Sequence, residues 1–224
     1  MVRRGRWALV AVAILAAVGV AGLRILRRTP APAAKHELPD VNGDGKVVVL
    51  CFGDSVTLGG ARGAYPAWLR SYFVPTVQVI NQGKYGEWTA DGVKRLAPLL
   101  DQLHPDYVIV QEGVNDAIRE GCANVDAIEG NFKQMIDRIH GAGAIPFVGT
   151  IFAAPSYAGE SGERCIDRIN QMIAGLPAER IDFAAAIRGH GELMLDGLHP
   201  NNRGYEVLAR QALDVLLRPR ESGG

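Results

Sequence analysis

The sequence has no excess of charge of either sign, because its 224 residues include 24 basic and 24 acidic side chains. The balance changes along the chain, since residues 1–34 contain six arginines and no acidic residue. The rest of the chain therefore holds 18 basic and 24 acidic side chains, a net charge of −6. Proteins that bind nucleic acids neutralise phosphates with clustered Lys and Arg. The sequence thus argues against a nucleic-acid partner.

From Lys46 onward the sequence lacks internal repeats and low-complexity tracts, and no cluster of residues suggests a metal site or another cofactor. No partner protein is evident. The chain is well supplied with apolar side chains, which make up 48% of its residues. A chain of this length can bury the core of one α/β domain and is hardly long enough for two.

The longest apolar run covers residues 7–23, which are 17 apolar or glycine residues with arginines on both sides. This is longer than the roughly 7–15 residues of a signal-peptide core and close to the lower limit for a membrane-spanning helix. We predict that residues 1–28 form an uncleaved transmembrane anchor that exports the following domain to the cell membrane or periplasm. Cleavage after the small residues 19–21 is the alternative and would give a secreted protein.

Residues 29–45 are rich in proline, glycine and short polar residues. They predict a tether without a core of its own, which would join the anchor to a domain over residues 46–219.

Short β-branched runs alternate with amphipathic helical segments from residue 46 onward. The predicted strands are 47–52, 76–80, 107–110, 146–152 and 180–183. The predicted helices are 61–73, 90–103, 124–141, 162–173 and 201–217. This alternation is typical of an α/β fold in which helices cover both faces of a parallel, doubly wound sheet.

The first predicted strand stops at Gly53, and a serine, Ser55, follows two residues later. Glycine allows backbone angles that other residues avoid, so the chain can turn at the carboxyl end of the strand, where open α/β sheets place their ligands. Ser55 would then lie at a helix N-terminus, a suitable place for a nucleophile.

Two of the five histidines, His104 and His199, have an acid three residues before them and a proline after them, but His104 stands at the end of a predicted helix. For His199 the acid is Asp196 and the proline is the rigid Pro200. Such a turn can place the carboxylate against Nδ1 of the imidazole and leave Nε2 free to take a proton from a serine.

Four segments together resemble the sequence blocks of the SGNH (GDSL) hydrolase family and occur in that family's order. They are Gly53-Asp54-Ser55, residues 81–86, Gly113-x-Asn115-Asp116 and Asp196-x-x-His199-Pro200. The resemblance implies a three-layer α/β/α, flavodoxin-like fold with about five parallel strands. It also implies hydrolysis of carboxylic esters.

The resemblance carries roles over to five positions. Ser55 matches the nucleophile, His199 the general base and Asp196 the acid that orients it. The backbone N–H groups of Ser55 and Gly86 and the side-chain amide of Asn115 match the oxyanion hole, whose donors stabilise the tetrahedral intermediate.

Three details of these blocks remain open or depart from the family. Gly83 is a second candidate for the oxyanion glycine, because one sequence does not fix the register of that loop. Trp88 stands where similar enzymes often have a small or polar residue, and its ring could narrow the acyl pocket. Asp54 and Asp116 are expected to pin their loops through backbone hydrogen bonds.

The leading hypothesis is a membrane-anchored or exported, lipase-like serine esterase whose substrate is a small-molecule ester. A carbohydrate O-acetylesterase that acts on cell-wall or capsular polysaccharide is the alternative, because the same residues could serve a glycan ester. A non-catalytic binding module is a third hypothesis, and it has no need for Ser55, Asp196 and His199 together.

Of the three cysteines, Cys51 lies inside a predicted strand and is expected to be a buried, inert thiol. Cys122 and Cys165 lie near the predicted carboxyl edge of the sheet. In an oxidising compartment we expect them to form a disulfide, and two unpaired thiols are the alternative.

Overall fold

The computed structural model describes residues 35–61, 63–119 and 121–220. The predicted anchor and the first part of the predicted tether lie outside the described residues.

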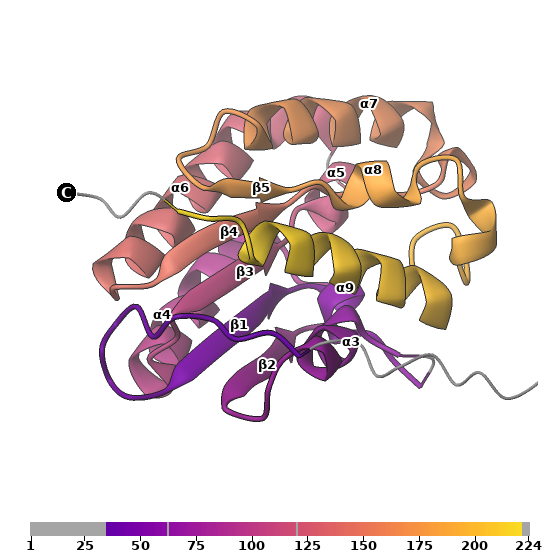
Figure 1. Ribbon diagram of the computed structural model, residues 1–224. Helices are drawn as coiled ribbons and strands as arrows, with labels where there is room; N and C mark the ends of the chain where they lie inside the picture. The colour runs from indigo at the N-terminus through magenta and orange to yellow at the C-terminus, as the bar shows by residue number, and fades with distance from the viewer. Residues whose placement is uncertain (1–34, 62, 120, 221–224) are drawn as a thin grey trace, which may run out of the picture. The chain divides into compact units, whose positions relative to one another are not determined.

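The domain is built on one sheet of five parallel strands in the order β2-β1-β3-β4-β5 (Figure 1). The strands are β1 (Val47–Gly53), β2 (Val77–Gly83), β3 (Tyr107–Gln111), β4 (Ile145–Gly149) and β5 (Glu179–Ile181). The predicted parallel α/β fold is therefore confirmed. The chain order reverses on the two sides of β1, which makes the carboxyl edge beside β1 the expected ligand site of such a sheet.

Helices cover both faces of this sheet, and α9 lies across its front in Figure 1. The α-helices are α2 (Ser55–Leu58), α3 (Tyr65–Tyr72), α4 (Thr89–Leu103), α5 (Val114–Arg119), α6 (Val125–Gly141), α7 (Pro155–Ile173), α8 (Phe183–Ile187) and α9 (Asn202–Leu216). Two 3₁₀ turns, η1 (Gly121–Asn124) and η2 (Gly191–Leu193), join them.

Successive residues of β1 point into two separate cores, as expected for a strand buried on both faces. Val49 and Cys51 pack with residues of α3, α8 and α9. Leu50 and Phe52 pack with residues of α4, α6 and α7. These two cores and the sheet between them form the predicted three layers.

Several boundaries differ from the sequence prediction, among them those of β2 and α7. Residues 81–83, predicted as loop, extend β2 because they pair in register with residues 51–53 of β1. Their polar side chains are tolerated because β2 is an edge strand. Helix α7 starts at Pro155, before the predicted start at residue 162, and is interrupted at Gly159, whose φ of 67° is left-handed.

Residues 35–45 also differ from the prediction of a tether, because they pack on the domain. The His36 N–H donates to the Tyr72 carbonyl at 2.9 Å, and Leu38 is buried in the core. The buried carboxylate of Asp106 accepts the Val41 N–H at 2.8 Å. The compact unit therefore begins at Lys35 and not at Lys46.

Cys122 in η1 and Cys165 in α7 form a disulfide, with their Cα atoms 5.0 Å apart. This confirms the predicted pairing. Cys51 is a free and fully buried cysteine, and burial raises the pKa of its thiol to about 12.

We expect one free thiol per chain, that of Cys51, when the unreduced protein is titrated with a thiol reagent under denaturing conditions. The disulfide links residues 43 positions apart, and the chain-entropy estimate for such a loop is about 4 kcal/mol. The double variant Cys122→Ser/Cys165→Ser should therefore unfold at lower urea concentration than the wild type. Three free thiols in the unreduced wild type would contradict the pairing.

Candidate active site

Ser55 is presented by the tight junction between β1 and α2. The Asp54 carboxylate caps α2 by accepting the Val56 N–H at 2.8 Å. A Cβ at Gly53 would lie 2.2 Å from the Gln111 carbonyl oxygen and 2.4 Å from Thr57 Oγ1. The glycine is thus needed for close approach of neighbouring backbone, and not for the unusual backbone angles that the sequence suggested.

His199 lies between Ser55 and Asp196. Ser55 Oγ is 2.9 Å from His199 Nε2, and His199 Nδ1 is 3.0 Å from Asp196 Oδ2. The other carboxylate oxygen of Asp196 accepts the backbone N–H groups of Leu198 and His199, both at 2.7 Å. The structure therefore brings together the three residues that the sequence selected for proton transfer, and the carboxylate fixes the shape of the turn that carries the histidine.

The electrostatics of this turn favour an ionised Asp196. Partial burial opposes ionisation, but hydrogen bonds from the His199 backbone and imidazole and from the Leu198 N–H outweigh it and lower the pKa of Asp196. An ionised carboxylate at Nδ1 keeps the proton of a neutral imidazole on that nitrogen. The lone pair on Nε2 then faces the serine hydroxyl.

The two candidate glycines, Gly83 at the end of β2 and Gly86 in the loop that follows, have different environments. The Gly83 N–H donates to Asn81 Oδ1 at 2.9 Å, and a Cβ at Gly83 would lie 2.0 Å from the Leu58 backbone nitrogen. Gly83 therefore serves the close packing of β2 on α2. Gly86 has a left-handed φ of 68°, and a Cβ there would meet only Arg119, at 3.9 Å. Of the two candidates, Gly86 has the geometry of an exposed loop donor.

Asn115 lies in the first turn of α5, and its side chain is nearly buried. One hydrogen of its amide donates to the Glu87 carbonyl oxygen at 3.0 Å. A primary amide carries two hydrogens, so this bond orients the amide and leaves a second donor.

Trp88 and Arg119 stand beside Gly86. The Arg119 guanidinium lies 5.9 Å from the centre of the Trp88 ring, a cation–π distance. The half-buried ring is therefore held at the edge of the loop. That it narrows an acyl pocket stays a prediction.

Exposed apolar side chains gather on the loops that carry the candidate residues. The described chain has five large apolar side chains that are strongly exposed, and four of them adjoin these loops: Leu58, Tyr85, Tyr157 and Leu195. Leu58 closes α2, Tyr85 precedes Gly86, and Leu195 precedes Asp196. Tyr157 packs against Gly197 in the histidine turn. We call these four residues the apolar rim.

Four buried carboxyl groups lie beneath these loops: Asp54, Glu87, Glu112 and Asp116. Asp116 accepts the Thr89 N–H at 3.1 Å and the Thr89 hydroxyl at 2.7 Å. Asp54 and Asp116 thus pin their loops, as predicted. Glu87 and Glu112 were not predicted as part of the site. Their only signal in the sequence is that Glu87 follows Gly86 and Glu112 precedes Gly113.

Burial raises the pKa of two of these groups. Desolvation, aided by the charges of Asp116 and Glu87, raises the pKa of Asp54 to about 7, although the Val56 N–H lowers it. Desolvation, with Asp54 and Glu87 nearby, raises the pKa of Glu112 well above 4.5. The environment of Glu112 therefore favours the neutral, protonated form of its carboxyl group.

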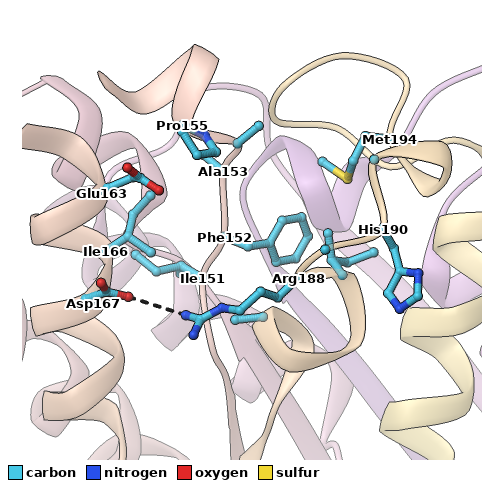
Figure 2. Close-up of a pocket in the computed structure, with 15 residues that line it drawn as sticks. Ile151, Phe152, Ala153, Pro155, Glu163, Ile166, Asp167, Arg188, His190 and Met194 are labelled. Atoms are coloured by element: carbon cyan, nitrogen blue, oxygen red, sulfur yellow. Dashed lines mark hydrogen bonds and ion pairs between the residues drawn. The ribbon is translucent and has the colours of Figure 1, made fainter. Parts of the chain in front are cut away.

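A cavity of about 630 Å³ lies between the loop after β4, α7, α8 and η2. In Figure 2 the Phe152 ring lies near its middle, and Arg188 reaches Asp167 at 3.4 Å. Ser55, Asp196 and His199 do not line this cavity. It borders the histidine turn through Ala154, whose N–H donates to the Gly197 carbonyl at 2.6 Å. The cavity therefore neighbours the candidate catalytic residues without containing them.

Comparisons with known proteins agree with this fold. A family model described as the GDSL-like Lipase/Acylhydrolase family matches residues 51–207. An arylesterase of Vibrio mimicus is 29% identical over 178 residues, which is 76% of this chain and 88% of that protein. Thioesterase 1/protease 1/lysophospholipase L1 of Escherichia coli strain K12 is 27% identical over 171 residues, 72% of this chain and 79% of that protein.

Two solved structures share the fold. One is a putative lipolytic protein of the G-D-S-L family from Desulfitobacterium hafniense, with a TM-score of 0.64, 20% identity, and coverage of 76% of this chain and 99% of that one. The other is Axe2, an acetylxylan esterase from Geobacillus stearothermophilus, with a TM-score of 0.65, 20% identity, and coverage of 84% and 98%.

The raised pKa of Glu112 predicts a pH-dependent effect of Glu112→Gln on stability. Above the ordinary pKa of a glutamic acid, unfolding ionises Glu112 and releases its proton, so this residue's contribution to the free energy of unfolding falls as pH rises. Glutamine has no proton to lose. Between pH 5 and pH 8 the variant should therefore gain stability relative to wild type, by at most about 1.4 kcal/mol per pH unit.

Urea unfolding at both pH values measures this difference. The matched control is Glu160→Gln, the same substitution at a side chain that is 94% exposed. It should shift stability equally at the two pH values. The same result for Glu112→Gln would show that Glu112 is ionised in the folded protein.

Proposed function

Because the chain belongs to the GDSL-like lipase/acylhydrolase family, and is thus a carboxylic ester hydrolase, we propose that it acts through Ser55, His199 and Asp196 as a serine esterase. The observation that carries the proposal is the pair of distances at His199: 2.9 Å from Nε2 to the serine oxygen and 3.0 Å from Nδ1 to the aspartate. A serine hydroxyl needs an adjacent, oriented base to become nucleophilic.

In the proposed first half-reaction, Ser55 Oγ attacks the ester carbonyl carbon while His199 Nε2 takes the hydroxyl proton. The carbonyl oxygen becomes an oxyanion that receives hydrogen bonds from the Ser55 and Gly86 N–H groups and the second amide hydrogen of Asn115. Asp196 stabilises the imidazolium. The intermediate then collapses, His199 gives its proton to the leaving alcohol, and the acyl group stays on Ser55.

In the second half-reaction water replaces the alcohol. His199 takes a proton from the attacking water, whose oxygen adds to the acyl carbon. The same donors hold the second oxyanion. Collapse breaks the bond to Ser55 Oγ, which recovers its proton from His199, and the carboxylic acid leaves.

The apolar rim supports an ester with an apolar acyl or aryl group as the substrate. Tyr85 is 75% exposed beside Gly86, and Leu58 is 42% exposed near Ser55. Exposed apolar surface around a site favours ligands that cover it. An arylesterase among the relatives points the same way.

A carbohydrate O-acetylesterase is the second candidate. The exposed rings of Tyr85 and Tyr157 offer flat faces on which a sugar ring could stack, and an acetyl group needs no deep acyl pocket. A panel of aryl esters of increasing acyl length, set beside acetylated oligosaccharides, separates the two candidates by their kcat/KM values.

We further propose that the domain works outside the cytoplasmic membrane, held by residues 7–23 or released after their cleavage. Within the described residues no helix is long and apolar enough to cross a membrane, and the proposed anchor lies outside them. The disulfide between Cys122 and Cys165 supports an oxidising compartment.

Substitutions at Ser55 and Asn115 should lower kcat for p-nitrophenyl acetate by different amounts. Ser55→Ala removes the nucleophile and should nearly abolish kcat. Asn115→Ala removes one oxyanion donor and should lower kcat by about 10²–10³ with little change in KM. Substantial activity in a folded Ser55→Ala protein would rule out the covalent mechanism.

The location predicts that protease added to intact spheroplasts will degrade the domain, because the chain beyond the anchor lies outside. A cytoplasmic marker protein in the same cells should survive and shows that the membrane is closed. A domain protected as well as the marker would contradict the location, and the mass of the isolated chain reports whether residues 1–21 were removed.

A further inference from the structure

The loop that carries Gly86 is held from beneath by one side chain of α4. Arg95 Nε donates to both carboxylate oxygens of Glu87, at 2.8 and 2.9 Å, and Arg95 Nη2 donates to Oε2 as well. The Glu87 side chain is completely buried, and that of Arg95 is 21% exposed. Bidentate pairs of this kind fix geometry in a way that a single contact does not.

The same guanidinium also binds the ends of two strands. Arg95 Nη1 donates to the Gln82 carbonyl at 2.9 Å, and Nη2 reaches the Gly53 carbonyl at 3.4 Å. Its central carbon lies 4.1 Å from the centre of the Phe52 ring. Arg95 therefore joins the carboxyl ends of β1 and β2 to the loop that follows β2.

Glu87 links Arg95 to the two proposed oxyanion donors that lie outside α2, the Gly86 N–H and the Asn115 amide. Its own N–H donates to the Lys84 carbonyl at 3.3 Å, so a fixed Glu87 closes the turn that contains Gly86. Its backbone carbonyl accepts the Asn115 amide at 3.0 Å. Movement of Glu87 would thus displace both donors at once.

The buried Glu112 lies near this pair. Among the described residues neither of its carboxyl oxygens has a hydrogen-bond partner, and burial, with the charges of Asp54 and Glu87, raises its pKa. At the surface the Glu87 carboxylate also pairs with Lys84, at 3.3 Å.

We infer that Arg95 and Glu87 are positioning residues for the oxyanion hole. Resting on the proposed function, the inference assigns them no contact with substrate. They set where the Gly86 N–H and the Asn115 amide lie, and a donor displaced by about 1 Å can cost up to roughly 10²-fold in rate. A shift of the donors affects the transition state and leaves ground-state binding nearly unchanged.

The test compares Arg95→Lys and Arg95→Met with Lys94→Met, its neighbour on α4. Lys94 pairs with Asp91 at the surface, and its side chain is 77% exposed. We expect about a 10- to 100-fold loss of kcat on p-nitrophenyl acetate in Arg95→Met, with KM within about twofold of wild type. Lys94→Met should match the wild type.

Arg95→Lys provides a second test of the inference if Arg95→Met does not fold. Lysine keeps the charge beside Glu87 but cannot form the planar fork, so the bonds to the β1 and β2 carbonyls are lost. We expect this variant to melt as one cooperative unit and to lose roughly tenfold in kcat at an assay temperature below its Tm. Millimolar guanidinium should partly restore kcat in a small-residue variant, Arg95→Ala, and not in Asn115→Ala.

The outcomes separate this inference from the proposed function. An active, folded Ser55→Ala protein would overturn the proposed function whatever Arg95 does. If Ser55→Ala is inactive and folded Arg95→Lys keeps wild-type kcat, the positioning role is overturned. A rise in KM with unchanged kcat would also overturn it, because that pattern marks lost substrate binding.

Discussion

The constraint on which the candidate site depends is the alignment of three strand ends around a residue with no side chain. Gly53 closes β1 in register with Gly83 of β2 and Gln111 of β3. A Cβ at Gly53 would collide with the Gln111 backbone, and one at Gly83 would collide with α2. Because these positions are glycines, the loops that carry Ser55 and Gly86 leave the sheet at the same level and side by side.

This alignment gathers several buried carboxyl groups next to the site. Buried ionised groups are costly unless they are paired, so burial raises the pKa of some of these carboxyl groups while another is paired with a cation. Glu112 has a raised pKa, the pKa of Asp54 is near 7, and Glu87 is matched by Arg95. The outcome is a buried polar layer next to the loops, in which the Glu87 backbone carbonyl accepts the Asn115 amide.

The strands and the proton-transfer residues could be predicted because their signals are local. A β-branched run such as residues 47–52 specifies a buried strand, and the Asp196 to His199 spacing specifies a turn within four residues. Contacts between distant residues leave no such pattern. The 65-residue span between Val41 and Asp106 is one example, and it makes residues 35–45 part of the domain. The pairing of Arg95 with Glu87 joins residues only eight positions apart, but it also could not be predicted, since it depends on how α4 packs beneath the strands.

The central claim is that Ser55 is the nucleophile of an enzyme that forms a covalent intermediate. The most direct measurement is the intact mass of the protein after reaction with a fluorophosphonate, followed by peptide mapping of the modified residue. We expect one adduct per chain, located on Ser55, and slow labelling in His199→Ala because the base is missing. An adduct on another residue, or none in folded protein that hydrolyses esters, would contradict it.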